Sequence, residues 1–281
     1  MLDIIIDTLI DGLKLLPFLF ITFLLIELIE HKFSKKTKKI ISKSGKYGPI
    51  LGSILGILPQ CGFSVMATNL YVTRIISIGT LFSIYLSTSD EMLPILLSSK
   101  ADLSIILSIL LVKFLIGILC GFLIDFIYRK KHNDDNVNYD ICDEEHCHCD
   151  DGLLKSTFIH TINILIFIMI ITFLISIVLE YIGEDFLSKL LLKDSIFGPI
   201  ISSLIGLIPN CGASVVLTEL YLNNTISFGS TIAGLLTGSG VALLVLFKSN
   251  KNIKENFCIL GILYLIGVFS GIIIELMEMI L

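Results

Sequence analysis

ILPQCGFSV, residues 57–65, returns 150 residues later as LIPNCGASV, residues 207–215. Half of the positions between 48 and 79 (16 of 32) are identical at this offset. The identities include the Gly-Pro pair that opens each copy and the Thr-x-Leu-Tyr that follows each core. The chain is therefore an internal duplication. Each copy carries a Pro-Gln/Asn-Cys-Gly turn inside an otherwise apolar stretch.

The composition is that of a membrane protein. The chain has 281 residues, of which 54% are hydrophobic and 16% charged, and its mean hydropathy is +0.92. Soluble domains carry about 25% charged residues. Apolar runs long enough to cross about 30 Å of hydrocarbon recur along the chain. We therefore expect an all-α integral membrane protein whose partner is the lipid bilayer. The net charge of −5 gives no reason to expect a nucleic-acid partner.

The duplicated core is too short on each side of its turn to cross a bilayer. Residues 48–58 make only about 16 Å of helix, and residues 63–74 are again half-length. Pro59 removes a backbone donor, and Gly62 permits unusual dihedral angles. The pattern predicts a broken or re-entrant helical hairpin at 48–74 and a second at 198–222. Such a tip is tolerated only where protein or a water-filled cavity satisfies its backbone.

The remaining apolar stretches predict full spans, and the charges of the loops orient them. The spans are expected at about 13–30, 77–97, 103–128, 156–180, 227–247 and 257–278. The loop at 31–46 is strongly basic and should be cytoplasmic, whereas its counterpart at 181–197 is not basic and should lie outside. This opposite asymmetry predicts inverted-topology repeats, with about ten membrane segments when hairpin arms are counted. Both termini are then outside.

Three parts follow from this organisation. Residues 1–128 form the first membrane repeat, residues 129–155 a cytoplasmic linker, and residues 156–281 the second membrane repeat. The opening residues are acidic rather than basic, so no cleavable signal peptide is expected. A multi-pass protein of a prokaryotic cell membrane is the predicted location.

Polar residues at the two hairpin tips are the first candidate binding site. If the hairpins meet, their amides, thiols and hydroxyls converge near a pseudo-two-fold axis, where helix ends attract ions. The alternative is that the cysteines pack as small hydrophobic residues while Pro and Gly shape the bend. The tip candidates are Gln60, Cys61, Ser64, Asn210, Cys211 and Ser214.

Acidic residues inside apolar stretches are the second candidate. Asp90 and Glu91 lie within the 77–97 span, and Glu219 lies on the second hairpin. Its counterpart in the first hairpin is Asn69, which we include among the candidate substrate-binding residues. An ionised group at that depth is costly and suggests a functional role. The alternative is an ion pair with Lys113, the one basic residue deep in a span. Glutamates near the ends of spans, Glu275 and Glu278 among them, are expected to be ordinary boundary residues.

The identity of a bound ion is left open by these residues. A hard cation such as Mn²⁺ favours carboxylate and amide oxygens, while a soft ion or arsenite favours thiolates. The candidate metal ligands in the membrane part are Cys61, Cys211, Asp90, Glu91 and Glu219. No resident cofactor is expected, but a divalent metal, Mn²⁺ or Zn²⁺, is expected as cargo.

The linker carries a third candidate in CDEEHCHCDD, residues 142–151. Cysteine and histidine at this spacing can hold Zn²⁺ or another transition metal, as a sensor or loading site. The alternative is a solvated acidic loop whose thiols stay reduced. The candidate ligands are Cys142, His146, Cys147, His148 and Cys149.

The paired Pro-Gln-Cys-Gly and Pro-Asn-Cys-Gly elements resemble a family of prokaryotic permeases described as ten-transmembrane heavy-metal exporters. Gly-Pro introduces each element (Gly48-Pro49 and Gly198-Pro199), and Thr-x-Leu-Tyr follows it at 68–71 and 218–221. The resemblance extends over nearly the whole chain, including a central loop rich in His, Cys and acidic residues. It implies export of a metal or metalloid, without saying which ion.

These observations together predict a secondary-active exporter of a divalent transition metal, with Mn²⁺ ahead of arsenical species. We expect alternating access, with the ion between the hairpin tips and protons as the coupling ion. Two alternatives stay open: a transporter of a small organic or oxyanionic solute, and a membrane metal sensor that does not transport. The sequence has no phosphate-binding loop, dinucleotide fingerprint or His-Glu-x-x-His, so we do not expect ATP-driven pumping by this chain alone. The tip cysteines have no histidine near them in the sequence, so we expect no enzyme activity. It leaves open whether the chain forms a homo-oligomer.

Overall fold

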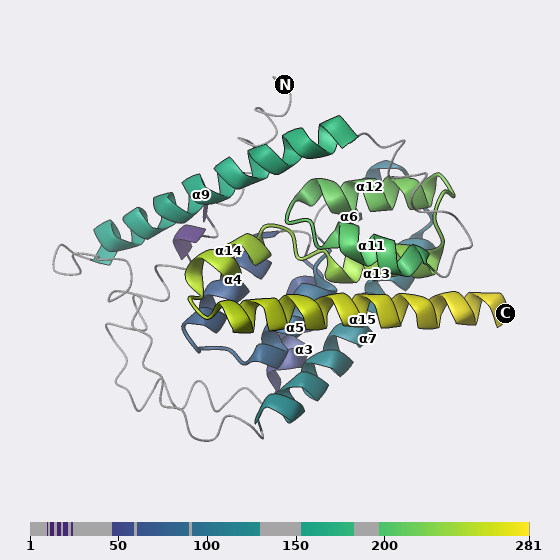
Figure 1. Cartoon of the computed structure of the whole chain (residues 1–281), viewed down its shortest axis with the longest axis horizontal. Coiled ribbons are helices and arrows are strands. Elements are labelled where there is room, and N and C mark those ends of the chain that lie inside the picture. The colour runs from purple at the N-terminus through teal and green to yellow at the C-terminus, as the bar shows by residue number, and fades with distance from the viewer. Residues whose placement is uncertain are drawn as a thin grey trace.

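The computed structural model of the chain describes residues 47–58, 61–89, 92–129, 153–182 and 197–280, together with residues 10, 12–13, 16–17, 19–21 and 24. Every regular element in these ranges is a helix, which confirms the predicted all-α class (Figure 1). Four segments in the described ranges are long and apolar enough to cross a membrane by length and composition: Leu103–Tyr128, Thr157–Leu174, Phe228–Ser249 and Ile253–Met279.

The duplication seen in the sequence is repeated in the helices. The first set is α3 (Gly48–Gly56), α4 (Cys61–Val72), α5 (Ile78–Ser87), α6 (Met92–Ser98) and α7 (Leu103–Arg129). The second set is α11 (Gly198–Gly206), α12 (Cys211–Leu222), α13 (Phe228–Thr237), α14 (Ala242–Ser249) and α15 (Ile253–Ile280), and each of its helices begins 150 residues after its counterpart. Helix α9 (Leu153–Ile182) precedes the second set. Both predicted hairpins are thus pairs of short helices.

Two spans that were expected to be continuous are interrupted halfway. The expected span at 77–97 is divided into α5 and α6, and the expected span at 227–247 into α13 and α14. In the second repeat the break is Gly238-Ser239-Gly240-Val241, where Gly240 has a φ of +56°. Glycine adopts this left-handed conformation without the steric cost that a side chain incurs. Each repeat therefore has two interruptions, the predicted one at the hairpin tip and a second one here.

The short helices begin at residues suited to helix starts. Proline occupies the first turn of α3 and of α11, where its missing N–H has no helical partner in any case. The Ser77 hydroxyl accepts a hydrogen bond from Thr80 N at 3.1 Å and caps α5, and Ser227 caps α13 in the same way. At the second tip the side chain of Asn210 accepts from Gly212 N at 3.0 Å and caps α12.

Glycines let the helices of each repeat approach closely. A Cβ on Gly56 would lie 2.1 Å from Ser87 Oγ, and one on Gly48 would lie 2.1 Å from Thr80 Oγ1, so α3 and α5 run parallel. Gly79 lies at the start of α5 and Gly121 in the second half of α7. A Cβ on Gly121 would lie 2.8 Å from Gly79 O, so α5 and α7 are antiparallel. The second repeat packs α11, α13 and α15 in the same way. Small residues spaced by four positions are typical of such contacts in membranes.

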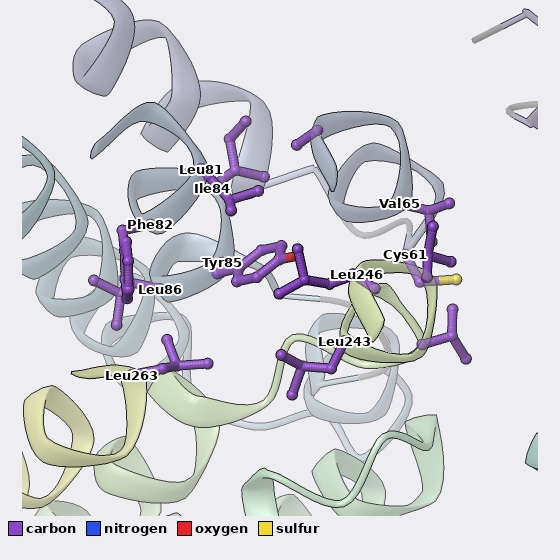
Figure 2. Packing of buried hydrophobic residues seen from close by; sticks show 14 of the residues in the cluster. Cys61, Val65, Leu81, Phe82, Ile84, Tyr85, Leu86, Leu243, Leu246 and Leu263 are labelled. Carbon is purple, nitrogen blue, oxygen red and sulfur yellow. The ribbon is translucent and has the colours of Figure 1, made fainter. Parts of the chain in front are cut away.

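The second short helix of each pair packs against the other repeat. Helix α4 packs against α14, α12 packs against α6, and α5 contacts α13. One apolar core therefore draws on both repeats, and Figure 2 shows Tyr85 of α5 pointing toward Leu246 of α14. Helices α7 and α15 run in opposite directions in Figure 1, and Tyr128 near the end of α7 lies 3.3 Å from the thiol of Cys258 near the start of α15.

Candidate functional site

The interruption between α5 and α6 is tied to the end of α3. Ser89 N donates to Gly56 O at 3.2 Å, and the Ser89 hydroxyl donates to Ile57 O. Both acceptors are carbonyls that the end of α3 leaves without helical partners. The first tip and the second interruption of this repeat are therefore held as one unit.

The equivalent interruption in the second repeat is held differently. Thr237 donates to Ser203 O at 2.8 Å, which links α13 to α11. Ser239, the counterpart of Ser89, is fully buried, and its hydroxyl has no hydrogen-bond partner within the described part of the chain. The hydroxyls of Ser53 and Ser203, which are equivalent to one another, are also buried and unpaired among described residues. Buried hydroxyls without partners are uncommon, and a bound water or ion is one of the arrangements that satisfies them.

A buried lysine joins the two interrupted helices. Lys113 of α7 is 1% exposed, and its ammonium donates to Thr88 O and to Leu235 O, the latter at 2.7 Å. Thr88 is the cap residue directly after the end of α5, and Leu235 lies in the last turn of α13. The positive charge is thus placed between one helix end from each repeat.

A short chain of hydroxyls connects the first hairpin to the same region. The Thr68 hydroxyl lies 2.6 Å from Tyr85 Oη and 3.4 Å from Ala242 O, at the start of α14. Thr68 and Tyr85 are both buried. The second arm of the first hairpin is thereby attached to the interrupted helix of the other repeat.

The tip residues that the structure describes have structural partners. Cys61 has a free thiol, is 9% exposed and belongs to the apolar core together with Val65 (Figure 2). The Ser64 hydroxyl donates to Cys61 O at 2.8 Å, and Asn210 acts as a helix cap. Ser214 is half-buried, and its carbonyl accepts a hydrogen bond from Thr218.

The pair Asn69 and Glu219 differs in burial although the two positions are equivalent. Asn69 is 2% exposed, and its amide nitrogen has no partner among the described residues. Glu219 is exposed on α12. Of the two, Asn69 is the residue that faces the interior.

Several predicted site residues fall outside what the structure describes. These are Gln60, Asp90, Glu91 and the linker residues Cys142, His146, Cys147, His148 and Cys149, together with the side chain of Cys211. Within the described ranges, no three His, Cys, Asp or Glu side chains come together as a metal-binding group.

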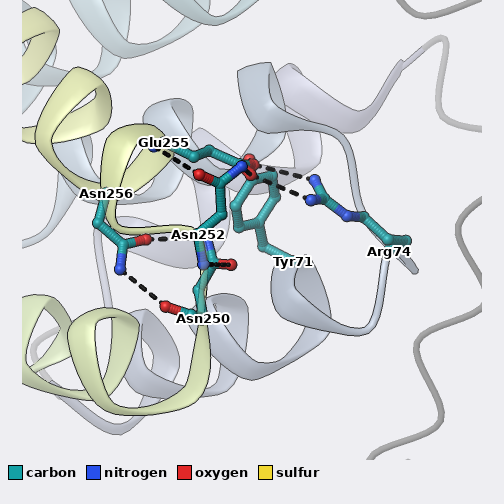
Figure 3. A network of polar contacts seen from close by, with 6 residues as sticks. All are labelled: Tyr71, Arg74, Asn250, Asn252, Glu255 and Asn256. Atoms are coloured by element: carbon teal, nitrogen blue, oxygen red, sulfur yellow. Dashed lines mark hydrogen bonds and ion pairs between the residues drawn. The ribbon is translucent and has the colours of Figure 1, made fainter. Parts of the chain in front are cut away.

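A second polar network lies at the end of the first hairpin (Figure 3). Arg74 makes two hydrogen bonds to the carboxylate of Glu255, at 3.0 and 3.1 Å, and Tyr71 donates to the same carboxylate. Burial alone would lower the pKa of Arg74, but its contacts with Glu255 and Tyr71 outweigh this and raise that pKa. Asn252 also donates to Glu255, at 3.2 Å. The network joins α4 of the first repeat to α15 of the second.

Two carboxylates with equivalent positions were not anticipated as functional in the sequence. Asp125 accepts from the Ser77 hydroxyl at 2.7 Å and from Gly79 N at 2.8 Å, and Glu275 accepts from the Ser227 hydroxyl at 2.5 Å. Glu275, expected to be a boundary residue, is in fact only 6% exposed. Both carboxylates stabilise a helix start, where the macrodipole is positive. Their offset of 150 residues was the available signal.

The comparison with known protein families agrees with this architecture. The profile of the ArsP_2 family, described as "Putative, 10TM heavy-metal exporter", matches residues 1–188 and 163–280. The chain belongs to this family. The resemblance seen in the duplicated motifs is confirmed, and the family is one of multi-pass membrane proteins. No curated protein and no solved structure matches the chain.

Proposed function

We propose that this family member is a secondary-active transporter that exports a divalent transition metal, Mn²⁺ ahead of arsenical species, by alternating access. The observation that carries the proposal is the meeting of two interrupted helices, one from each repeat, at Thr88 and Leu235. Helix ends inside a membrane protein offer carbonyl oxygens and amide groups that continuous helices do not expose. A site of this kind favours hard cations such as Mn²⁺.

The packing directions support inverted repeats and re-entrant hairpins as part of this proposal. Because α3 and α5 run parallel, α4 has to return the chain to the end at which α3 began. The equivalent helices α7 and α15 run in opposite directions (Figure 1). An exporter built in this way can open to either side by moving one repeat against the other.

The ligands that we propose are the oxygens around the interruptions together with the tip residues. The burial of Cys61 in the apolar core favours a packing role for its thiol. Asp90 and Glu91 follow Thr88 by two and three positions, and we propose that they supply the carboxylates and carry the coupling protons. If Asp90→Asn with Glu91→Gln leaves transport intact and equally pH-dependent, this coupling is wrong.

The experiment is metal flux into proteoliposomes at a fixed pH gradient, with Mn²⁺, Zn²⁺, Fe²⁺ and arsenite tested in parallel. A Cys61→Ser/Cys211→Ser double variant accompanies the wild type. Mn²⁺ flux that survives in the variant supports oxygen ligands. Arsenite or Zn²⁺ flux that is lost in the variant makes the tip thiols the ligands. Flux of none of these overturns metal export.

The buried ammonium of Lys113 favours one second candidate, a transporter of an oxyanion or a small organic anion. A positive charge between helix ends attracts an anion and repels a free cation. Competition separates the two functions, because an anion carrier should be indifferent to Mn²⁺.

A further inference from the structure

Lys113 is buried although the helix that carries it faces outward along much of its length. Its side chain is 1% exposed, whereas Leu107, Leu111, Leu115 and Leu119 on the same helix are 48–62% exposed. Removing an ammonium from water costs several kcal/mol unless hydrogen bonds and charges compensate. The position of Lys113 therefore depends on what its ammonium contacts.

Carbonyl oxygens at helix ends are among those contacts. Thr88 O lies just past the end of α5, and Leu235 O belongs to the last turn of α13, so one acceptor comes from each repeat. The C-terminal end of a helix carries a partial negative charge and leaves carbonyls without helical partners. These ends stabilise a positive charge between the repeats.

The same oxygens are suited to a metal ion. Hard cations are bound by backbone carbonyls and hydroxyls. The hydroxyl of Ser239, in the interruption that follows Leu235, is buried and has no partner within the described ranges. The ammonium thus occupies two carbonyl oxygens of the type that a divalent cation needs, and the Ser239 hydroxyl follows Leu235 by four positions.

Only one of the two repeats carries this charge. The position equivalent to Lys113 is Leu263, which is fully buried in the apolar core with Phe82 and Leu86 (Figure 2). Duplication alone would put the same residue in both places. A lysine in one copy makes the centre asymmetric and adds one fixed positive charge to it.

We propose that Lys113 is a tethered cation that competes with the transported metal ion for the carbonyl oxygens of Thr88 and Leu235. The inference rests on the proposed export of a divalent metal and names the residue that sets affinity at that site. With no metal bound, the ammonium holds the two interrupted helices together. When metal binds, it displaces the ammonium, and the return of the ammonium helps to expel the metal. Lys113 is thus a positioning residue that weakens binding and speeds release.

The test measures binding and turnover separately on the full-length protein. Mn²⁺ and Zn²⁺ binding is measured by equilibrium dialysis in detergent, and flux is measured in proteoliposomes, for wild type and Lys113→Met. Lys113→Gln is a second variant, because its amide can still donate to the two carbonyls without carrying charge. Lys254→Met is the matched control, since Lys254 is exposed at the start of α15. Thermal unfolding establishes that each variant is folded.

Competition predicts that metal affinity and maximal flux change in opposite directions. Both Lys113 variants should bind metal more tightly, with Kd lower by at least about tenfold, while the maximal flux falls, and the control should match wild type. A folded Lys113 variant whose Kd is unchanged or higher, beside a wild type that binds metal, overturns the competition alone. A wild type that binds none of the metals overturns metal export and the competition with it.

Discussion

Arg74 and Glu255 are 181 positions apart, yet they are joined by two parallel hydrogen bonds of 3.0 and 3.1 Å. The pair fixes the end of the first hairpin to the start of α15 in the other repeat (Figure 3). The equivalent positions are occupied by Asn224 and Ile105, which cannot form an ion pair. In this conformation one end of the pseudo-symmetric protein has a charged connection that the duplication does not repeat.

Reversing either charge of this pair should destabilise the protein. In Arg74→Glu or Glu255→Arg, two like charges face one another in a half-buried site, and we expect a loss of about 1–3 kcal/mol in the free energy of unfolding. The double reversal, Arg74→Glu with Glu255→Arg, should recover much of the loss. Chemical unfolding of the purified protein measures this. Simple additivity of the two single effects would show that the pair does not interact.

The glycines of α15 allow a matched comparison on one helix. A Cβ on Gly267 would lie 2.4 Å from Thr237 Cγ2 and 2.9 Å from Ala233 O, whereas no atom of the described residues outside the turns around it lies within 4 Å of one on Gly261. Gly267→Ala should therefore cost about 1–3 kcal/mol of stability through overpacking. Gly261→Ala should be neutral or stabilising by up to about 1 kcal/mol, because alanine favours a helix.

Thermal unfolding of these two variants in the same detergent is the measurement. Gly117→Ala tests the equivalent position in the first repeat, where a Cβ would lie 2.9 Å from Ser53 Oγ and 3.1 Å from Ser83 O. Equal melting temperatures for Gly261→Ala and Gly267→Ala would contradict the close approach of α13 and α15.

Removing the carboxylate that supports a helix start should affect both repeats to a similar degree. Asp125→Ala deprives Ser77 and Gly79 N of their acceptor, and Glu275→Ala deprives Ser227 of its acceptor. We expect each to cost about 1–3 kcal/mol, because hydrogen bonds to a charged group are lost. Asp125→Asn keeps an acceptor oxygen and should cost less. Unfolding free energies of the three variants are compared. If Asp125→Asn and Asp125→Ala cost the same, the charge rather than the acceptor dominates.

The helices of this fold could largely be predicted from the sequence, because the duplication supplies two readings of each element. The break between the two short helices of each pair was placed correctly because Pro59 and Pro209 cannot continue a helix. The interruptions after Ser87 and Thr237 were missed, since each stretch is apolar enough to read as one span. The tripeptides Ser-Thr-Ser at 87–89 and Gly-Ser-Gly at 238–240 indicated the breaks. The mean hydropathy of a whole span hides such short polar segments.

The site was harder to predict because its contacts are long-range. Lys113 donates to the backbone carbonyls of Thr88 and Leu235. Every residue has such a carbonyl, so the residue types at these positions do not reveal the contact. The sequence identified Lys113 only as a partner for the acids in the neighbouring span. The packing of each second short helix against the other repeat was equally invisible, since α4 packs on a helix about 180 residues later.

The linker should be dispensable for transport if the exporter works through its membrane part. Replacing residues 140–151 by a Gly-Ser segment of equal length removes the five candidate metal ligands. The connection between the first and the second repeat keeps its length. Flexible Gly-Ser segments impose no structure of their own. We expect metal flux in proteoliposomes to be retained, because the hydrogen bonds from Lys113 to Leu235 O and from Thr68 to Ala242 O join helices of the membrane part.

The matched control replaces only the cysteines and histidines, Cys142, His146, Cys147, His148 and Cys149, by serine and leaves the acidic residues in place. If the linker is a loading site, both variants should need more metal for half-maximal flux while their maximal flux stays the same. If the protein is instead a membrane metal sensor, the linker binds the metal and no transport occurs. Zn²⁺ binding would then disappear in both variants, and the wild type would show no flux to lose.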